Sequence, residues 1–505
     1  MQSTCNTAPF PACPAPFNLT SHVLAAGERT PDKDALCIVS PSTIERWTFA
    51  ELRQAVLGTA TGLKQAGFQS GDKLLLRLGN SADFPICYLA ALAVDLVPVP
   101  TSSSLTERET AQIIATLKPA GVLHTPAVAT ASHPRTLSDQ ELIPMRDLPQ
   151  ATPQLGDPER LGYVIFTSGT SGVPRAVAHA HRTIWARQMM FDGWYGLRHD
   201  DRVMHAGAFN WTYTLGTGLM DPWTIGATAF IPAPGTPVQD LPELMSQHQV
   251  SIFAAAPGVY RQLLDKVPSL NLKTLRHGLS AGEKLSPEIA RIWREKSGRQ
   301  IYEAYGMSEC STFISHPAGT VADPNTLGRP QAGRRVALLK DGEPVSAGHE
   351  GTIAVHKTDP GLMLGYLDAP EETAARMSGE WFLTGDQAMT DENGALIYLG
   401  RKDDMMNAGG FRVSPIEVEK VLAQFPGIKD VGVTDIMVKA DTRVIAAFYT
   451  GPHPLDDERL RAYVQQNLAR YKQPRLFIHL AELPLGNNGK LQRRSLASIY
   501  EGQHD

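Results

Sequence analysis

Residues 163–177 read YVIFTSGTSGVPRAV, and this stretch places an apolar run directly before six small residues. Residues 163–166 have the composition of a buried strand, whereas residues 167–172 supply two glycines and four hydroxyls. Successive backbone N–H groups in a Gly-rich turn form a concavity that binds anions, and Ser and Thr hydroxyls add neutral donors. The stretch therefore predicts a polyphosphate site at the end of a strand, with Arg175 adding positive charge.

Two other interpretations of this stretch compete with the phosphate site. The Walker pattern requires a second glycine five positions after Gly169, followed by lysine, and Pro174 occupies that position. An ordinary surface loop is the alternative for any cluster of Ser and Gly. The strand before the cluster and the proline after it favour the phosphate site.

The length and composition of the chain exclude several classes of protein. A chain of 505 residues has material for about three domains and can bury large cores. Its net charge of -5, from 47 basic and 52 acidic residues, argues against a dedicated nucleic-acid binder. The five cysteines are scattered without any CxxC, which indicates a reducing compartment without a disulfide framework or a zinc site.

The sequence also indicates a location. The first twenty residues are Pro-rich, are expected to be irregular, and lack the basic and apolar regions of a signal peptide. No stretch reaches the ~18–20 apolar residues that span a bilayer. We therefore expect a cytoplasmic protein with neither a membrane nor a nucleic acid among its partners.

Helical and strand-like segments alternate up to about residue 330. Residues 48–67 carry apolar residues at spacings of three and four and end at Gly67, which predicts a helix, and residues 72–80 predict a buried strand. Such alternation implies a mostly parallel α/β sheet, whose ligands gather at the carboxyl ends of strands. Further short apolar runs that end in small residues predict strands at 120–125, 162–168, 201–207, 227–232, 250–257 and 275–282, with helices at 259–267 and 287–298.

The pattern changes after about residue 330. Residues 334–401 contain short apolar runs separated by Asp-Gly and Asn-Gly turns, which predicts a β-rich subdomain. Helical and strand-like segments start again after the charged and Gly-rich stretch near residue 405. The fold class is therefore α/β: a large N-terminal domain (1–400) of parallel-type α/β subdomains plus the β-rich subdomain, and a small mobile α+β C-terminal domain (401–505).

The phosphate stretch and six later motifs resemble one known family. FTSGTSGVPRAV closely resembles the phosphate loop of the adenylate-forming superfamily: acyl- and aryl-CoA synthetases, the adenylation domains of peptide synthetases, and firefly-type luciferases. One departure is that the family loop usually has Lys-Gly where this chain has Arg175-Ala176. The resemblance continues in order through YEAYGMSE (302–309), LGRP (327–330), GYLD (365–368), FLTGD (382–386), GRKDDMMNAGGFRVSPIEVE (400–419) and GNNGK (486–490).

The resemblance implies a reaction in two steps. A carboxylate attacks the α-phosphate of ATP to give an acyl-adenylate and pyrophosphate, and a thiol then displaces AMP. Both steps build negative charge, so positioning and electrostatics are expected to supply most of the catalysis. The resemblance places the β- and γ-phosphates on the loop, at Thr167, Ser168, Gly169, Thr170, Ser171, Gly172 and Arg175.

The YGMSE motif implies a metal site and a purine site. By resemblance, Glu309 coordinates Mg²⁺ and Ser308 contacts the α-phosphate; one carboxylate suffices for a cation that also binds phosphates and water. Tyr305 is expected to stack on adenine, while Asp386 and Arg401 reach the ribose. The alternatives are a solvated glutamate, a turn aspartate and a surface arginine. The rest of the expected adenine and ribose site consists of Ala281, Gly282, Glu283, Glu303 and Ala304.

The last two motifs imply the catalytic lysine and a domain rotation. Lys490 is expected to bridge the carboxylate and the α-phosphate, a role that suits a point charge on a long flexible stem; the alternative is a surface lysine beside a turn. Asp403 matches the hinge position, which would absorb a large change of dihedral angle. Gly409 and Gly410 are expected to lie against the pantetheine arm of CoA.

The acyl pocket is expected between residues 205–218 and the strand ends. Its predicted lining is apolar and aromatic, without an evident fixed charge, which favours an uncharged aromatic or medium-chain tail over an amino acid. The alternative for each aromatic residue is a place in the core. The predicted lining consists of Phe209, Trp211, Tyr213, Ser280, Gly306 and Met307.

Together these inferences predict an ATP-dependent acid:CoA ligase, similar to the medium-chain acyl-CoA and benzoate-type CoA ligases. Its expected cofactor is Mg²⁺, and its expected substrates are ATP, CoA and a small aromatic or medium-chain carboxylic acid. The alternative is a freestanding adenylation enzyme that loads an acyl carrier protein. A homodimer is an assembly state left open by the sequence.

Overall fold

The computed structural model describes residues 5–6, 8–167, 175–401, 404, 406–408, 411–439, 442–468, 470–486 and 490–501. Two compact units make up the chain: unit 1 comprises Met1–Thr4, Val336–Ala354 and Leu383–Asp505, and unit 2 comprises Cys5–Arg335 and Val355–Phe382. The expected boundary at residue 400 does not coincide with this division and stays a prediction. Within the described ranges, no helix is both long and apolar enough to cross a membrane.

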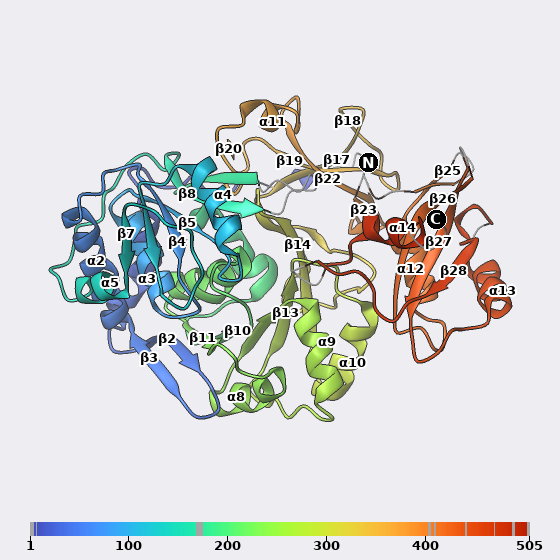
Figure 1. Ribbon diagram of the computed structural model, residues 1–505, viewed down its shortest axis with the longest axis horizontal. Coiled ribbons are helices and arrows are strands. Elements are labelled where there is room, and N and C mark those ends of the chain that lie inside the picture. Colours follow the sequence, from blue (N-terminus) through green and yellow to red (C-terminus); the bar gives the residue numbers. More distant parts are fainter. Residues whose placement is uncertain are drawn as a thin grey trace. The chain divides into compact units, whose positions relative to one another are not determined.

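A nine-stranded sheet forms the centre of unit 2 (Figure 1). Five of its strand pairs are parallel, as the alternating pattern predicts, and only the pairs at its two ends are antiparallel. The order across the sheet is β16 (Arg329–Pro330), β15 (Ser311–Ser315), β14 (Ile301–Met307), β13 (His277–Ala281), β12 (Ile252–Ala255), β10 (Arg202–His205), β11 (Thr228–Pro232), β2 (Asp34–Val39) and β3 (Ile44–Thr48).

Helices α8 (Leu241–Gln247), α9 (Pro257–Lys266) and α10 (Pro287–Ser297) pack against this sheet. Trp293 of α10 and Tyr260 of α9 are fully buried and contact Phe253 of β12. Both α9 and α10 begin with proline, whose fixed φ suits the first helical position. The expected helices at 259–267 and 287–298 are therefore confirmed.

A four-stranded parallel sheet also belongs to unit 2, in the order β5 (Val97–Pro100), β4 (Lys73–Arg77), β6 (Gly121–His124) and β7 (Thr136–Ser138). The expected helix at 48–67 is α2 (Phe49–Gln65), which Thr48 and Glu51 cap reciprocally. The remaining helices around this sheet are α3 (Asp83–Ala93), α4 (Glu107–Leu117) and α5 (Asp139–Met145).

The strand expected at 162–168 lies in a separate antiparallel sheet and not in the large parallel one. The run at 162–168 is β8 (Leu161–Thr167), which pairs antiparallel with β9 (Arg175–Ala180), and β9 pairs antiparallel with β20 (Gly365–Tyr366). Parallel strands need a crossover of a dozen or more residues, whereas β8 and β9 are joined directly by residues 168–174. The predicted phosphate loop therefore connects the two arms of a hairpin, and the strand register places Thr167 opposite Arg175.

The β-rich region expected at 334–401 is confirmed. It contains β17 (Arg335–Lys340), β18 (Glu343–Pro344), β19 (Gly351–His356), β21 (Met377–Ser378), β22 (Trp381–Thr390) and β23 (Leu396–Arg401). The tight turn between β17 and β18 uses Asp341 and Gly342, both with positive φ, as the Asp-Gly pair predicts.

The last hundred residues form the expected α+β arrangement. Strands β26 (Asp430–Lys439), β27 (Thr442–Thr450) and β28 (Leu476–His479) make one sheet. Helices α12 (Pro415–Leu422) and α13 (Asp457–Asn467) share its core, and α14 (Arg493–Glu501) lies against β26, where Leu496 is fully buried beside Ile436.

The N-terminal segment is less irregular than expected. Asn18 caps α1 (Leu19–Leu24), so the irregular region ends before residue 20. The other elements are β1 (Cys5–Asn6), η1 (Ala25–Arg29), α6 (Thr183–Ala186), η2 (Phe191–Tyr195), η3 (Thr214–Met220), α7 (Asp221–Ile225), η4 (Val238–Asp240), α11 (Pro370–Ala374), β24 (Met406–Ala408), β25 (Phe411–Val413) and η6 (Arg470–Lys472).

Candidate active site

The carboxyl ends of β13 and β14 bring two predicted groups of residues together. The parallel register sets Ser280 opposite Glu303 and Ala281 opposite Ala304. Residues predicted for the purine and for the acyl pocket therefore lie next to one another at one edge of the nine-stranded sheet, where parallel sheets bind ligands.

Glu309 follows β14 and is held by the segment around β20. Its carboxylate Oε1 accepts a hydrogen bond of 2.7 Å from the Tyr366 hydroxyl, and its backbone carbonyl accepts one of 2.7 Å from the Met363 amide. Only 8% of the residue is exposed. The predicted metal ligand is thus oriented by a phenol from a distant part of the chain.

Tyr366 also contacts the cation at the end of the predicted phosphate loop. The Arg175 guanidinium lies 5.3 Å from the centre of the Tyr366 ring, and Arg175 Nε lies 2.7 Å from a carboxylate oxygen of Glu372. Burial, followed by the negative charge of Glu309, raises the pKa of Tyr366, so the phenol keeps its proton. Sequence reasoning missed this residue, although it stands in the GYLD motif.

Replacing Tyr366 with phenylalanine is expected to weaken binding of Mg²⁺ at the predicted Glu309 site. A hydrogen bond to a charged group contributes about 1.5–3 kcal/mol, so Tyr366→Phe is expected to lower kcat/KM by roughly tenfold and to raise the Mg²⁺ concentration needed for half-maximal activity. Titration of pyrophosphate release against Mg²⁺ measures both effects. Tyr302→Phe is the matched control, because its hydroxyl bonds to Thr320 and Gly319 instead. An unchanged Mg²⁺ titration in Tyr366→Phe would contradict the role.

Ser308 is fixed by β9. His179 Nε2 lies 2.8 Å from the Ser308 carbonyl oxygen, and the Cys310 amide donates to the Met307 carbonyl at 3.2 Å. Because residues 308–310 form a turn directly after β14, the predicted α-phosphate contact lies at the strand end.

The predicted purine residues have contacts of their own. Glu303 accepts hydrogen bonds from the Leu285 amide at 2.8 Å and from Lys284 Nζ at 2.5 Å, which closes the turn after β13. The Tyr305 ring stands edge-on to Phe313, with centroids 5.4 Å apart. Glu283 is half-buried.

Gly282 has a backbone that favours glycine. Its φ is +94°, and a Cβ there would stand 2.8 Å from the Trp211 ring. A side chain at this position would therefore displace Trp211, which links the end of β13 to the predicted acyl-pocket segment.

The two predicted ribose residues face each other in unit 1. Asp386 of β22 pairs directly with Arg401 of β23, and the Tyr398 hydroxyl donates to Asp386 Oδ1 at 2.9 Å. Asp386 is 7% exposed. Lys490, in the same unit, is exposed, and its carbonyl accepts a hydrogen bond from the Gly486 amide at 2.7 Å.

Several predicted residues have no structural account. The side chain of Thr167 is not described, and the following predictions lie outside the described residues: Ser168, Gly169, Thr170, Ser171, Gly172, Asp403, Gly409 and Gly410.

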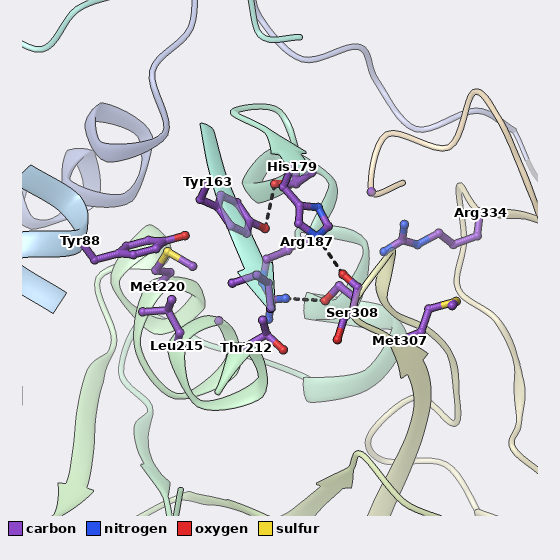
Figure 2. A pocket seen from close by; sticks show the side chains of 15 residues that line it. Tyr88, Tyr163, His179, Arg187, Thr212, Leu215, Met220, Met307, Ser308 and Arg334 are labelled. Atoms are coloured by element: carbon purple, nitrogen blue, oxygen red, sulfur yellow. Dashed lines mark hydrogen bonds between the residues drawn. The ribbon is translucent and has the colours of Figure 1, made fainter. Parts of the chain in front are cut away.

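A pocket lies beside Met307 and Ser308 in unit 2 (Figure 2). The segment predicted to line the acyl site contributes Thr212, Leu215 and Gly216 to it. This stretch is helical and continues as η3, a π-helix, in which residues about four apart, such as Thr212 and Gly216, lie on one face. The remaining lining residues are Tyr88, Tyr163, Ile165, His179, Thr183, Arg187, Met220, Ser311, Arg334 and Gly361.

The aromatic residues predicted for the acyl pocket lie elsewhere. Phe209 is fully buried and stacks on Phe84 with centroids 6.2 Å apart. Trp211 and Tyr213 pack edge-to-face at 5.1 Å. These three residues, with Ser280 and Gly306, are not among those that line the pocket of Figure 2, and their acyl-binding roles stay predictions.

A buried ion pair forms one wall of this pocket. Arg187 binds both carboxylate oxygens of Asp221, at 2.8 and 2.6 Å, and its Nη1 donates to Ser311 Oγ at 2.5 Å. Burial alone would lower the pKa of Arg187, but the charge of Asp221 raises it above its ordinary value. Arg187 is therefore protonated, and the negative charge of Asp221 neutralises it.

The comparisons with known proteins place this α/β fold among the adenylate-forming enzymes. Residues 23–367 match the model of the AMP-binding enzyme family, and residues 417–490 match that of the AMP-binding enzyme C-terminal domain. The chain belongs to the AMP-binding enzyme family, and within it the chain is an AMP-forming acyl-CoA ligase.

Similar proteins span nearly the whole chain. The acyl-coenzyme A synthetase ACSM3 of Rattus norvegicus is 27% identical and covers 89% of this chain and 84% of its own length. The acyl-CoA ligase YtcI of Bacillus subtilis is 27% identical over 97% of both chains. The structure of a benzoate CoA ligase from Burkholderia xenovorans superposes with a TM-score of 0.84 at 25% identity, covering 95% of this chain and 100% of that one.

Proposed function

We propose that this ligase activates a small aromatic or medium-chain carboxylic acid as its acyl-adenylate and transfers the acyl group to CoA, with release of AMP and pyrophosphate. The observation that carries the proposal is the pocket beside Ser308. Its walls include the apolar side chains of Leu215, Met220 and Met307, which suit an uncharged tail.

Each buried arginine of this pocket is paired with an aspartate. Arg187 binds Asp221, and Arg334 lies 2.5 Å from Asp359. A tail with a second carboxylate would need an uncompensated cation, since burying an unpaired charge is costly. The pairing therefore supports an uncharged tail.

Each predicted site residue has a proposed role in this reaction. Ser308 would contact the α-phosphate, Lys490 would bridge the carboxylate and that phosphate, and Asp386 with Arg401 would hold the ribose. Tyr305 would stack on adenine beside Ala281, Gly282, Glu283, Glu303 and Ala304. The loop from Thr167 to Arg175 would bind the β- and γ-phosphates.

Mg²⁺ belongs to this proposal as the cofactor. In proteins it commonly uses one or two carboxylates together with substrate phosphates and water, and the single carboxylate of Glu309, oriented by Tyr366, fits that ligand set. Over the described ranges, no group of three or more His, Cys, Asp or Glu forms a metal site of its own. Glu309 would therefore hold the ion together with ATP, and the ion would neutralise phosphate charge.

A panel of carboxylic acids with ATP, Mg²⁺ and CoA tests the proposal. We expect AMP and an acyl-CoA thioester, detected by mass spectrometry, from an aromatic or medium-chain acid, with little product from amino acids or dicarboxylic acids. Pyrophosphate release without a thioester would instead indicate a carrier protein as the acceptor. Reaction with amino acids alone would overturn the proposed substrate class.

Location and assembly are part of the same proposal. The scattered cysteines support a cytoplasmic enzyme. A homodimer stays a prediction, which size-exclusion chromatography with light scattering would test.

A further inference from the structure

The pocket beside Ser308 contains polar atoms that the protein itself leaves without partners. A row of aromatic rings forms one side of it: His179 stacks on Tyr163 with centroids 4.8 Å apart, and Tyr163 packs edge-on to Tyr88 at 6.0 Å. His179 lies next to Ser308, the predicted contact of the α-phosphate, so the row of rings leads from Ser308 into the pocket (Figure 2). Within the part of the chain that the structure describes, Tyr88 Oη and His179 Nδ1 are buried without a hydrogen-bond partner.

The bonding of His179 determines what its free nitrogen can do. Nε2 lies 2.8 Å from the Ser308 carbonyl oxygen, which can only accept, so Nε2 carries the proton. Burial lowers the pKa of His179 to about 4, so the ring is neutral near pH 7. Nδ1 is consequently an acceptor, and only a donor satisfies it.

Tyr88 offers a second polar atom farther along the row. It is fully buried in α3, and burial raises the pKa of its hydroxyl, which therefore remains a phenol that can donate or accept. Figure 2 shows this hydroxyl pointing from the Met220 side toward Tyr163 and Arg187. By contrast, the Tyr163 hydroxyl already contacts Thr183 Oγ1 at 3.2 Å.

Arg187, one of the two arginines that line the pocket, already has several hydrogen-bond partners. Arg187 Nη2 lies 3.3 Å from both Tyr195 Oη and Thr217 Oγ1, in addition to its bonds with Asp221 and Ser311. Along the aromatic row, a ligand group therefore meets one unpartnered acceptor, His179 Nδ1, and one unpartnered phenol, that of Tyr88.

We propose that the acid carries a hydroxyl or amino group on its tail, and that His179 and Tyr88 select for this group. The inference rests on the proposed function and narrows its substrate class. A hydroxyl or amino group close to the carboxylate of the acid donates to His179 Nδ1. A hydroxyl or amino group farther along the tail bonds to the Tyr88 hydroxyl. An apolar tail of the same size leaves both buried atoms unpaired, which a protein site discriminates against strongly.

Matched acids test this inference. The kcat/KM for pyrophosphate release is measured for the three hydroxybenzoates and the three aminobenzoates against the three methylbenzoates, which are similar in size but cannot form the hydrogen bond. We expect at least one hydroxyl or amino isomer to exceed its methyl counterpart by more than roughly tenfold. Equal use of the methyl acids would overturn the inference and would mean that the two atoms hold only water.

Two variants assign the preference to residues. Tyr88→Phe and His179→Phe each remove one of the two atoms, and at least one of them is expected to reduce the hydroxyl-to-methyl ratio about tenfold. Tyr163→Phe is the control on the same wall, and it is expected to change that ratio less because its hydroxyl is already bonded. A ratio unchanged in both test variants would overturn the assignment.

The assay also separates this inference from the proposed function. If neither these acids nor the medium-chain acids of the panel release pyrophosphate, the proposed function fails. If acids react without preference for the hydroxyl or amino group, the inference alone fails. The methyl acids measure the activity that each variant keeps without the tail hydrogen bond, which includes any loss caused by removing the Ser308 contact in His179→Phe.

Discussion

Lys490→Ala is expected to slow adenylate formation on the order of 100- to 1,000-fold, because the predicted role of Lys490 is to supply a positive charge to the transition state. The second step should change little, since the lysine is expected to act on the carboxylate and the α-phosphate. The two steps can be measured separately. Pyrophosphate release from acid and ATP reports the first, and thioester formation from synthetic acyl-adenylate and CoA reports the second.

The control for this variant is Lys429→Ala. Lys429 is an exposed lysine of the same unit, in the turn before β26. Equal losses in both steps would mean that Lys490 acts on folding or on CoA binding. An unchanged first step would remove Lys490 from the mechanism and leave the GNNGK motif as a surface turn.

Asp221→Ala is expected to produce the largest loss of stability. The aspartate is fully buried, and its removal leaves the Arg187 guanidinium buried without its counter-charge. Breaking one partner of a buried ion pair costs about 3–5 kcal/mol in the free energy of unfolding. Urea denaturation followed by tryptophan fluorescence measures this in unit 2, because all seven tryptophans lie in that unit.

Two further variants test whether the unpaired charge of Arg187 causes the loss of stability in Asp221→Ala. The double variant Arg187→Met with Asp221→Leu removes both charges and is expected to lose less stability than Asp221→Ala alone. Glu288→Gln breaks an exposed pair with Arg291 on α10 and should leave the urea midpoint nearly unchanged. A small effect of Asp221→Ala would mean that the arginine finds another partner or water.

Much of the fold follows from local patterns. The helix α2 begins at a Thr48–Glu51 capping box and ends before Gly67, so its bounds follow from chemistry within the segment. The pairing partner of β8, by contrast, cannot be predicted from its own segment. An apolar run predicts a buried strand, but the direction of its neighbour depends on how the chain returns, and residues 168–174 return it directly into β9.

In the candidate site, too, some residues can be predicted from local sequence and others cannot. Glu309 stands in a motif that the sequence alone makes visible. Tyr366 and His179 act through contacts with residues far away in the chain, and no local signal marks which atom they meet. The segment 205–218, predicted for the acyl site, contributes Thr212, Leu215 and Gly216 to the pocket beside Met307, and its role in binding the acyl group stays a prediction. The sequence does not show which of its side chains line the pocket, because that depends on how the backbone is wound.

The division of the chain also has a consequence for its synthesis. Unit 2 consists of Cys5–Arg335 and Val355–Phe382, and the intervening Val336–Ala354 belongs to unit 1. A ribosome must therefore pass Phe382 before unit 2 has all of its strands, including β20 with Tyr366. Val336–Ala354 in turn leaves the ribosome well before Leu383–Asp505 exists. Nascent chains released between these points would contain unpaired strand edges, which favour aggregation.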